Sequence, residues 1–399
     1  MALTNPIILS DGKTVMARAI LKEGGKLAIA SVDSGPLTVL DFGIANVLGY
    51  VDGMLVFGRL DGTISAVPFD LAKRTVTGDP VTLLTGVNAK TEGGLNAALS
   101  RTGTLVFLRG SSGSQLLVAD AKGASISQSA ERAQFRNARW SPDGAKIAVQ
   151  MRGSGAASIA SDVWLYDVAT TSLSRLTTSG AGLPAWSPDG KWIAYQGLLG
   201  DVPVMVVPVD GSAPPRVVAV ASDEPNFTPD GQSIVVRRVT ARGTANLVRL
   251  SLTEPATEEI LLGDGGFHGQ PSVSPDGKWL AYVTEQDGRQ NVFVRSMSPG
   301  GGRVQLSTGN GVAPRWGWQP NTLYYRADNR VRRVTLNLTG GLPTVTARDS
   351  LLALPSSSST FDVHPDGRQF VYVRDGLEDA RPVVFTNWAR TVVGKVRKR

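Results

Sequence analysis

The tripeptide Asp41-Phe42-Gly43 is the first place in this sequence where residue types and spacing could do chemistry. In phosphoryl-transfer enzymes the Asp of this tripeptide holds the magnesium ion that bridges the ATP phosphates. That chemistry also needs a Gly-rich loop, a strand Lys and a His-Arg-Asp loop upstream. The forty residues before Asp41 contain no His and no Gly-rich loop that enters a strand. We therefore predict no kinase activity and expect Asp41 in a link between two β-rich units.

Nucleophilic hydrolysis is not indicated either. The chain has no Cys, no G-x-S-x-G segment and two histidines, of which His364 replaces Ser in a Pro-Asp-Gly turn and His268 lies in GGFHGQP. The many Asp-Gly pairs occur singly and never as the D-x-D-x-D-G loop that gathers oxygens around calcium. We predict no catalytic residue, no metal site and no cofactor, so the chain is not expected to be an enzyme.

Composition and charge narrow the class of protein further. The 399 residues are 42% apolar and 19% charged, with 45 Gly and 23 Pro, which favours many turns over long helices. The net charge of +7 comes from basic residues spread along the chain, so no nucleic-acid partner is predicted. No run of 18 apolar residues exists, and MALTNPIILSDG lacks the pattern of a signal peptide. We expect no direct membrane insertion.

A repeated turn organises the chain. Clear copies are WSPDGAKIAV, WSPDGKWIAY, FTPDGQSIVV and VSPDGKWLAY, and weaker ones extend the series to nine units. The fourth turn position falls at residues 12, 53, 103, 144, 190, 231, 277, 320 and 367, a period of about 45. Each turn is followed by two apolar runs and a polar one, which reads as four short strands. A four-strand unit of this length is the signature of a propeller blade.

The predicted fold is therefore an all-β, closed β-propeller of four-stranded blades. Closed propellers have four to eight blades, so from nine counted units we expect about eight, in one domain spanning residues 1–399.

Two columns precede the turns. An apolar column, including Ile8, Trp140, Trp186, Phe227, Val273, Trp316 and Val363, should lie in the seams between blades, because strand side chains alternate between faces. A mostly polar column lies one residue earlier and could either line an axial channel or make local hydrogen bonds at blade ends. Loops between blades are the other place for a binding surface. The candidate binding residues are His268 and Gln270 on a loop, and Arg139, Asn226, Arg315 and Asp362 in the polar column.

The Pro-Asp turns resemble the WD-like repeats of TolB, of tricorn protease and of prolyl-oligopeptidase relatives. Longer stretches, among them GTISAVPFDLAKRTVTGDPVTLLTGV and SDVWLYDVATTSLSRLTT, resemble the C-terminal sensor propeller of bacterial membrane-spanning serine/threonine protein kinases. The chain departs from that group in lacking the kinase domain, the membrane helix and the earlier repeats. The resemblance implies a regulatory or recognition module and an extracytoplasmic or periplasmic location, with no activity carried over.

Three functions follow as hypotheses. The first is a non-catalytic propeller that binds a protein, peptide or small ligand in signalling or assembly. The second is a TolB-like extracytoplasmic scaffold within an envelope complex. The third is an enzyme that uses an open propeller channel, such as a lyase or lactonase, which would need acids or histidines clustered at the channel mouth.

Overall fold

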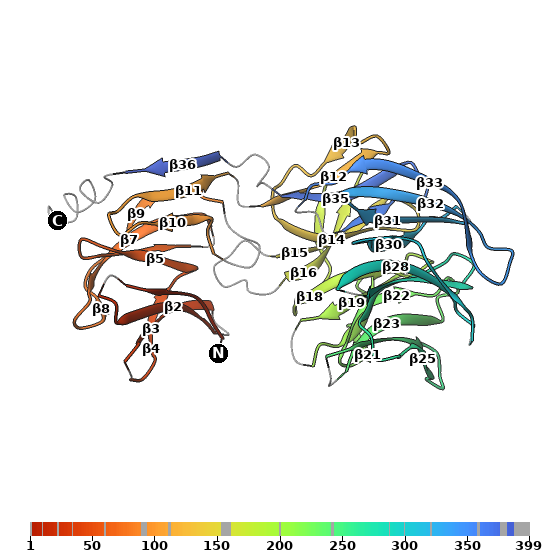
Figure 1. Cartoon of the computed structure of the whole chain (residues 1–399), viewed down its shortest axis with the longest axis horizontal. Helices are drawn as coiled ribbons and strands as arrows, with labels where there is room; N and C mark the ends of the chain where they lie inside the picture. Colours follow the sequence, from red (N-terminus) through yellow and green to blue (C-terminus); the bar gives the residue numbers. More distant parts are fainter. Residues whose placement is uncertain are drawn as a thin grey trace.

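The part of the chain described by this computed structural model consists of β-strands and loops, without a helix. It comprises residues 2–9, 11–21, 24–33, 35–59, 61–88, 94–110, 113–152, 161–198, 201–240, 243–286, 288–298, 300–319, 321–356, 360–375 and 381–386. Within these ranges no helix has the length and apolarity needed to cross a bilayer. The strands form nine antiparallel sheets, which Figure 1 shows as two groups placed side by side.

The first group, called here the three-sheet group, contains most of the first 110 residues and one late strand. Its sheets are β1–β4 (Ala2–Ile8, Thr14–Leu21, Gly24–Ser31, Thr38–Gly43); β5–β8 (Asn46–Val51, Met54–Gly58, Ile64–Asp70, Thr75–Val76), with β9 (Val81–Leu84) also paired to β7; and β10 (Ala97–Leu99), β11 (Leu105–Arg109) and β36 (Arg381–Phe385).

The second group, called the six-sheet group, contains β12 to β35. Its sheets are β13-β12-β35-β34 (Ser125–Gln128, Ser114–Asp120, Gln369–Asp375, Phe361–Val363); β14–β17 (Gln134–Trp140, Lys146–Arg152, Ser161–Asp167, Leu173–Arg175); β18–β21 (Ala181–Trp186, Trp192–Gly197, Val204–Pro208, Arg216–Ala219); β22–β25 (Ser222–Phe227, Ser233–Val239, Ala245–Ser251, Glu258–Leu262); β26–β29 (His268–Val273, Trp279–Gln286, Arg289–Ser296, Arg303–Gln305); and β30–β33 (Val312–Trp316, Thr322–Ala327, Arg330–Asn337, Thr344–Ala353).

Each of the nine counted turns joins two neighbouring strands of one of these sheets, such as β14 and β15 or β34 and β35. Two units exchange their later strands. The third unit begins with β10 and β11, but its next strands, β12 and β13, join the sheet of β34 and β35 of the ninth unit, where β12 pairs with β35. The ninth unit in turn sends β36 back to pair with β11. β12 and β35 are in register from Ser114 opposite Asp375 to Asp120 opposite Gln369, so two distant segments hold one sheet together.

The repeated turn is stabilised by its own side chains. In the unit at residue 190, Ser187 Oγ donates to Asp189 Oδ1 at 2.5 Å and accepts from the N–H of Trp192 at 2.9 Å. Asp189 Oδ1 also accepts from the N–H of Lys191 at 3.0 Å. Gly190 has φ +70°, a conformation that a β-carbon disfavours. These contacts explain why Ser or Thr, Pro, Asp and Gly recur together.

Apolar seams join neighbouring sheets in the six-sheet group. Each seam is a buried cluster shared by two adjacent sheets, and the apolar column residue Trp140, Trp186, Phe227, Val273, Trp316 or Val363 contributes to one of them. The innermost strands also touch in the order β14, β18, β22, β26, β30, β34 and back to β14. The predicted place of the apolar column in the seams is therefore confirmed for these six residues.

The three-sheet group has two such seams among the described residues, one between the first and second sheets and one between the second and third. The expected seam position of Ile8 is wrong, because Ile8 is 63% exposed on the outer side of the first sheet, where none of these seams lies. The predictions of one domain and of about eight blades stay predictions, and a six-and-three division is proposed below.

Candidate binding site in the central cavity

The innermost strands of the six-sheet group carry a β-bulge at the same repeat position. The register shifts between Asp223 and Asn226 in β22, and equivalent shifts occur in β14, β18, β26 and β30. The first bulged residue has φ between 50° and 53° in every case, and a Pro follows it in four of the five strands. Pro suits this place because it has no N–H to give to the ladder. The first bulged residues are Asn137, Leu183, Glu224, Gln270 and Ala313.

These bulges surround a cavity of about 210 Å³ at the centre of the six-sheet group. It is lined by the bulged residues, by part of the polar column and by Thr360, which lies just before β34. Bulges re-aim side chains, which is why residues from five different sheets converge here. The polar members of the lining are Asn137, Arg139, Glu224, Asn226, Gln270, Arg315 and Thr360.

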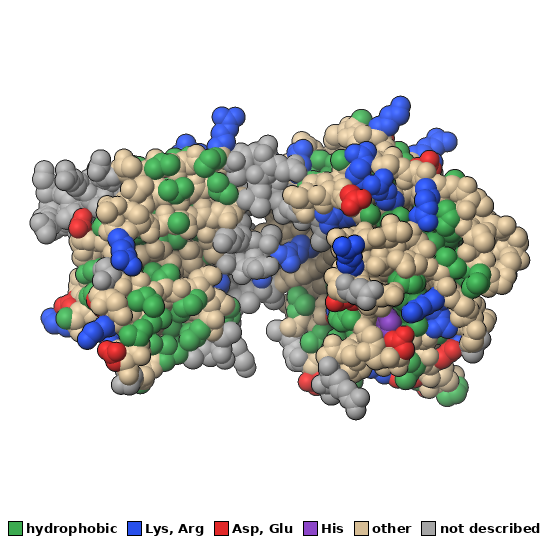
Figure 2. Space-filling view, viewed as in Figure 1, with side chains coloured by type: hydrophobic (Ala, Val, Ile, Leu, Met, Phe, Trp, Pro, Cys, Tyr) green, Lys and Arg blue, Asp and Glu red, His purple; other side chains and the backbone are tan. Residues whose placement is uncertain are grey.

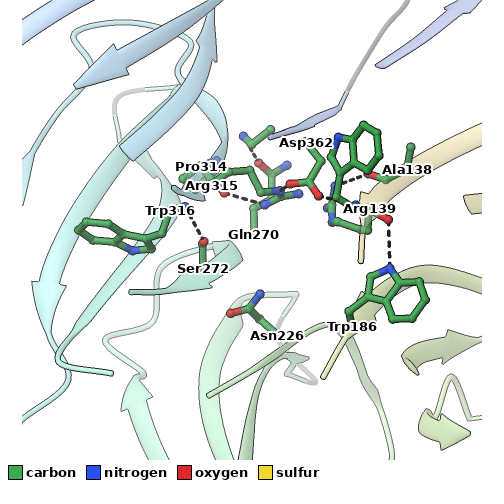
Figure 3. Close-up of polar contacts among 12 residues, drawn as sticks. Ala138, Arg139, Trp186, Asn226, Gln270, Ser272, Pro314, Arg315, Trp316 and Asp362 are labelled. Carbon is green, nitrogen blue, oxygen red and sulfur yellow. Dashed lines mark hydrogen bonds and ion pairs between the residues drawn. The ribbon is translucent and has the colours of Figure 1, made fainter. Parts of the chain in front are cut away.

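Two arginines and a carboxylate meet at one side of this cavity (Figure 3). Arg315 Nε lies 3.9 Å from Asp362 Oδ1, and Arg315 Nε is buried without a hydrogen-bond partner. Burial lowers the pKa of Arg315 to about 9, with the charge of Arg139 adding to this effect and Asp362 opposing it. Burial also lowers the pKa of Arg139, against the attraction of Asp362 and Glu224. Two guanidinium groups therefore share one nearby carboxylate in a desolvated place.

Glu224 lies on the other side of the cavity. Its Oε2 accepts from the N–H of Gln270 and lies 3.6 Å from Arg237 Nε. Arg237 is also bound to Asp223, with Nε 2.7 Å from Oδ1. Burial raises the pKa of Glu224, although Arg237 and the Gln270 N–H act in the opposite direction. This side of the cavity is acidic, whereas the side with Arg139 and Arg315 is basic.

The polar column also links neighbouring sheets through hydrogen bonds. Asp362 Oδ2 accepts from the N–H of Trp140 at 2.8 Å, and Asn226 Oδ1 accepts from the N–H of Val273 at 2.9 Å. Ser272 Oγ accepts from the N–H of Trp316 at 3.2 Å. The sequence left open whether this column lines a channel or makes local hydrogen bonds. In the structure Arg139, Asn226 and Arg315 line the cavity, Asn226 also makes one of these hydrogen bonds between sheets, and the axial channel stays a prediction.

The predicted binding residues are not all in one place. Arg139, Asn226, Gln270 and Arg315 line the cavity, and Asp362 contacts Arg315 beside it. His268, expected on an exposed loop, is instead the first residue of β26 and is 1% exposed. Its Nε2 pairs with Asp264 Oδ1 at 2.7 Å, and its ring packs edge-on against Tyr282. His268 therefore has a structural environment outside the cavity.

Glu224 and Asn137 were missed by the sequence reasoning. The sequence does mark their position, because each bulged residue directly precedes the Pro position of the repeat, as in Glu224-Pro225. The residue types at this position, Asn, Leu, Glu, Gln and Ala, have nothing in common, so no shared letter marks the column. The expected place of Asp41 in a link between two units is wrong, because Asp41 lies within the outer strand β4, where it is 94% exposed and pairs with Lys26 at 3.0 Å. Among the described residues, no group of three His, Asp or Glu side chains could hold a metal ion.

Comparison with known proteins agrees with this architecture. Residues 104–333 match the family described as the TolB β-propeller domain, PD40. The chain belongs to this family. The fold is shared with TolB of Agrobacterium tumefaciens, at a TM-score of 0.51 and 18% identity, over 66% of this chain and 98% of that one.

Two curated relatives cover part of this TolB-type chain. An uncharacterized protein of Agrobacterium fabrum is 30% identical over 159 residues, which are 36% of this chain and 53% of the relative. An uncharacterized peptidase of Bacillus subtilis is 29% identical over 158 residues, which are 37% of this chain and 22% of the relative. The chain thus spans about half or less of either relative.

Proposed function

We propose that the six-sheet group is a closed six-bladed propeller and that it works as a non-catalytic recognition module for a protein or peptide. Three observations support closure: the order of innermost strands returns to its start, six seams join six sheets, and β12 with β35 ties the two ends of the group. Residues 114–375 also make up about the share of the chain that matches TolB of Agrobacterium tumefaciens.

The ligand group that this cavity fits best is a carboxylate, from an acidic side chain or a peptide C-terminus. The observation that carries this is Arg315 Nε, which is buried and unpartnered beside Arg139. Burying a guanidinium without full hydrogen bonding is costly, and a second like charge nearby adds to the cost. A ligand carboxylate would accept charge-assisted hydrogen bonds from both arginines and offset that cost.

The acidic side of the cavity adds a second requirement. Glu224 is on β22 and Arg315 on β30, so a bound segment would present a negative group towards β14 and β30 and a hydrogen-bond donor towards β22. A peptide backbone or an amide next to an acidic residue has this pattern. A volume of about 210 Å³ accommodates one or two side chains, so the rest of the partner would contact the surrounding loops.

The test is selection of random peptides displayed on phage against the full chain, followed by binding measurements with fluorescent copies of the selected peptides. We expect enrichment of Asp, Glu or free C-termini, and about tenfold or larger weakening when Arg315→Gln or Arg139→Gln is introduced. Replacing the peptide carboxylate by its amide should weaken binding to the native chain to a similar extent.

Arg332→Gln is the matched control, because Arg332 pairs with Asp328 on the outer part of the six-sheet group and is partly exposed. Circular dichroism would check that each variant is folded. Selected peptides without an acidic group, or peptides that bind the Arg139 and Arg315 variants as tightly as the native chain, would contradict the proposal.

Two more specific roles, a scaffold in an envelope complex and a kinase sensor, depend on the cellular location and partners of the protein. A scaffold role in an envelope complex is favoured by the TolB fold, whereas the role of a kinase sensor rests on the sequence resemblance and stays a prediction. The name of the Bacillus subtilis relative describes that protein as a peptidase. This chain carries no G-x-S-x-G segment, and a channel enzyme of the lyase or lactonase type remains an unsupported alternative.

A further inference from the structure

The outer face of the first sheet of the three-sheet group is apolar across all four strands. Residues paired directly across strands share a face, and the pairs Ile8 with Val15 and Ala28 with Val39 lie on the side that faces away from the second sheet. Ile8 is 63% exposed and Leu3 is 48% exposed. The charged pair Lys26 and Asp41 lies at the edge of this surface, called here the Ile8 face. Its exposed or partly exposed apolar members are Leu3, Ile8, Val15 and Val39, whereas Ala17 and Ala28 between them are at most 5% exposed.

The opposite end of the three-sheet group is also apolar. In the sheet of β10, β11 and β36, Val106 pairs with Ala98 and with Val384, and Leu108 pairs with Pro382. These residues face away from the seam, to which Leu105 and Phe107 contribute instead. Val106 is 41% exposed and Val384 is 63% exposed, so this surface, called the Val384 face, is open to solvent. Figure 2 shows hydrophobic side chains, in green, gathered on the surface of this group at the left.

The same positions are covered in the six-sheet group. Trp140, Phe227, Val273 and Trp316 correspond to Ile8 in their units, and each is at most 9% exposed in a seam. The first sheet therefore carries apolar side chains at the seam position of the repeat, and its two largest exposed ones, Leu3 and Ile8, are not packed in a seam. Contiguous exposed apolar surface of this kind marks an interaction site.

We propose that the three-sheet group binds the three-sheet group of a second copy of this chain, the Ile8 face of each copy lying on the Val384 face of the other. This rests on the closed six-bladed propeller proposed above: if six sheets complete a ring in residues 114–375, two stacks of three carry the number of sheets that one ring needs. A two-fold axis makes both contacts equivalent, and together they cover both open faces of both copies. A single sheet from another source would cover one face only.

The experiment is sedimentation equilibrium of the full chain across a wide concentration range. We expect a reversible dimer, and Ile8→Glu or Val384→Glu should each raise the dimer dissociation constant by about tenfold or more, because a charge would be buried in an apolar contact. Ile260→Glu is the control, since Ile260 is 60% exposed on the outer strand β25 of the six-sheet group. This variant should dimerise as the native chain does.

Mixing the two variants tests which faces meet. In a mixed dimer, one contact joins the unaltered Ile8 face of one copy to the unaltered Val384 face of the other. The mixture should therefore dimerise more strongly than either variant alone. A chain that stays monomeric at every concentration overturns the proposal. A dimer whose dissociation constant is unchanged by Ile8→Glu also overturns it. A mixture of the two variants that dimerises no more strongly than either variant alone overturns it as well, because this result would mean that like faces meet.

Discussion

Alanine substitutions at two turn glycines should separate two contributions to the loss of unfolding free energy. One is backbone strain and the other is overpacking. Gly144 and Gly190 occupy the same turn position, with φ +71° and +70°. A β-carbon on Gly190 would have Pro142 Cδ as its nearest neighbour at 3.7 Å, which is ordinary contact. A β-carbon on Gly144 would lie 2.1 Å from His364 Nε2, which is a clash. The first substitution therefore costs backbone strain alone, and the second adds overpacking.

The magnitudes follow from these contacts. Alanine in the left-handed region costs roughly 1–2 kcal/mol, which is the expected loss for Gly190→Ala. At Gly144, overpacking adds about 1–3 kcal/mol, because the ring of His364 is not free to move aside. That ring packs edge-on against Trp140 with centroids 4.7 Å apart, and its Nδ1 accepts from the N–H of Asp366 at 3.2 Å. Gly144→Ala should therefore lose roughly 2–5 kcal/mol in total.

The assay is urea unfolding followed by Trp fluorescence, which reports on the later part of the chain because all eight Trp residues lie beyond residue 139. His364→Ser introduces the residue that other turns carry and removes the clashing ring. In that background Gly144→Ala should cost about as much as Gly190→Ala, a coupling of roughly 1–3 kcal/mol. Equal losses at the two glycines in the native background, or no coupling to His364, would refute this reasoning.

Three further predictions, which use four substitutions, test the core of the six-sheet group by the same unfolding assay. Asp162 is 4% exposed and accepts from Arg175, so Asp162→Asn should lose about 2–3 kcal/mol, and a loss below about 0.5 kcal/mol would contradict its role. Burial raises the pKa of Glu224 above its usual 4.5, so the free energy of unfolding should fall as pH rises from 4.5 through the raised pKa. Glu224→Gln should remove that fall. An unchanged pH profile in this variant would contradict the prediction. The indole of Trp186 donates to a carbonyl of β14 at 3.0 Å, whereas that of Trp316 is buried without a partner. Trp186→Phe should therefore cost about 1 kcal/mol more in hydrogen bonding than Trp316→Phe, and the reverse order would count against this account.

The turn and its neighbouring strands were predictable because their chemistry is local. Ser187, Asp189 and Gly190 satisfy one another within six residues, so the same letters give the same corner wherever they occur. Alternating apolar runs then fix which face of each strand enters a seam. This is why the nine counted units correspond to the nine observed sheets.

The exchange of strands between the third and ninth units could not be read from the sequence. The outer strands β12 and β13 would meet similar apolar partners on either β11 or β35, and the spacing of the turns does not distinguish these choices. The pairing is decided by which sheets close together in space. The burial of His268 could not be predicted for the same reason. It depends on contacts with Tyr282 and Asp264, and the Gly-rich sequence around His268 does not indicate these contacts.

The candidate site lies at the sheet that this exchange creates. Asp362 belongs to β34, in the sheet shared by the third and ninth units, while Arg139 and Arg315 belong to the sheets on either side. Asp362 accepts from the N–H of Trp140 on one side and lies beside Arg315 on the other, so it connects both neighbours of that sheet. The sheet that carries Asp362 is itself held together by the pairing of β12 with β35, from Ser114 opposite Asp375 to Asp120 opposite Gln369. A ligand carboxylate held by both arginines and Asp362's sheet should by linkage stabilise the β12 and β35 pairing, and a change that populates the separated form should weaken binding only by the fraction of joined chains that is lost.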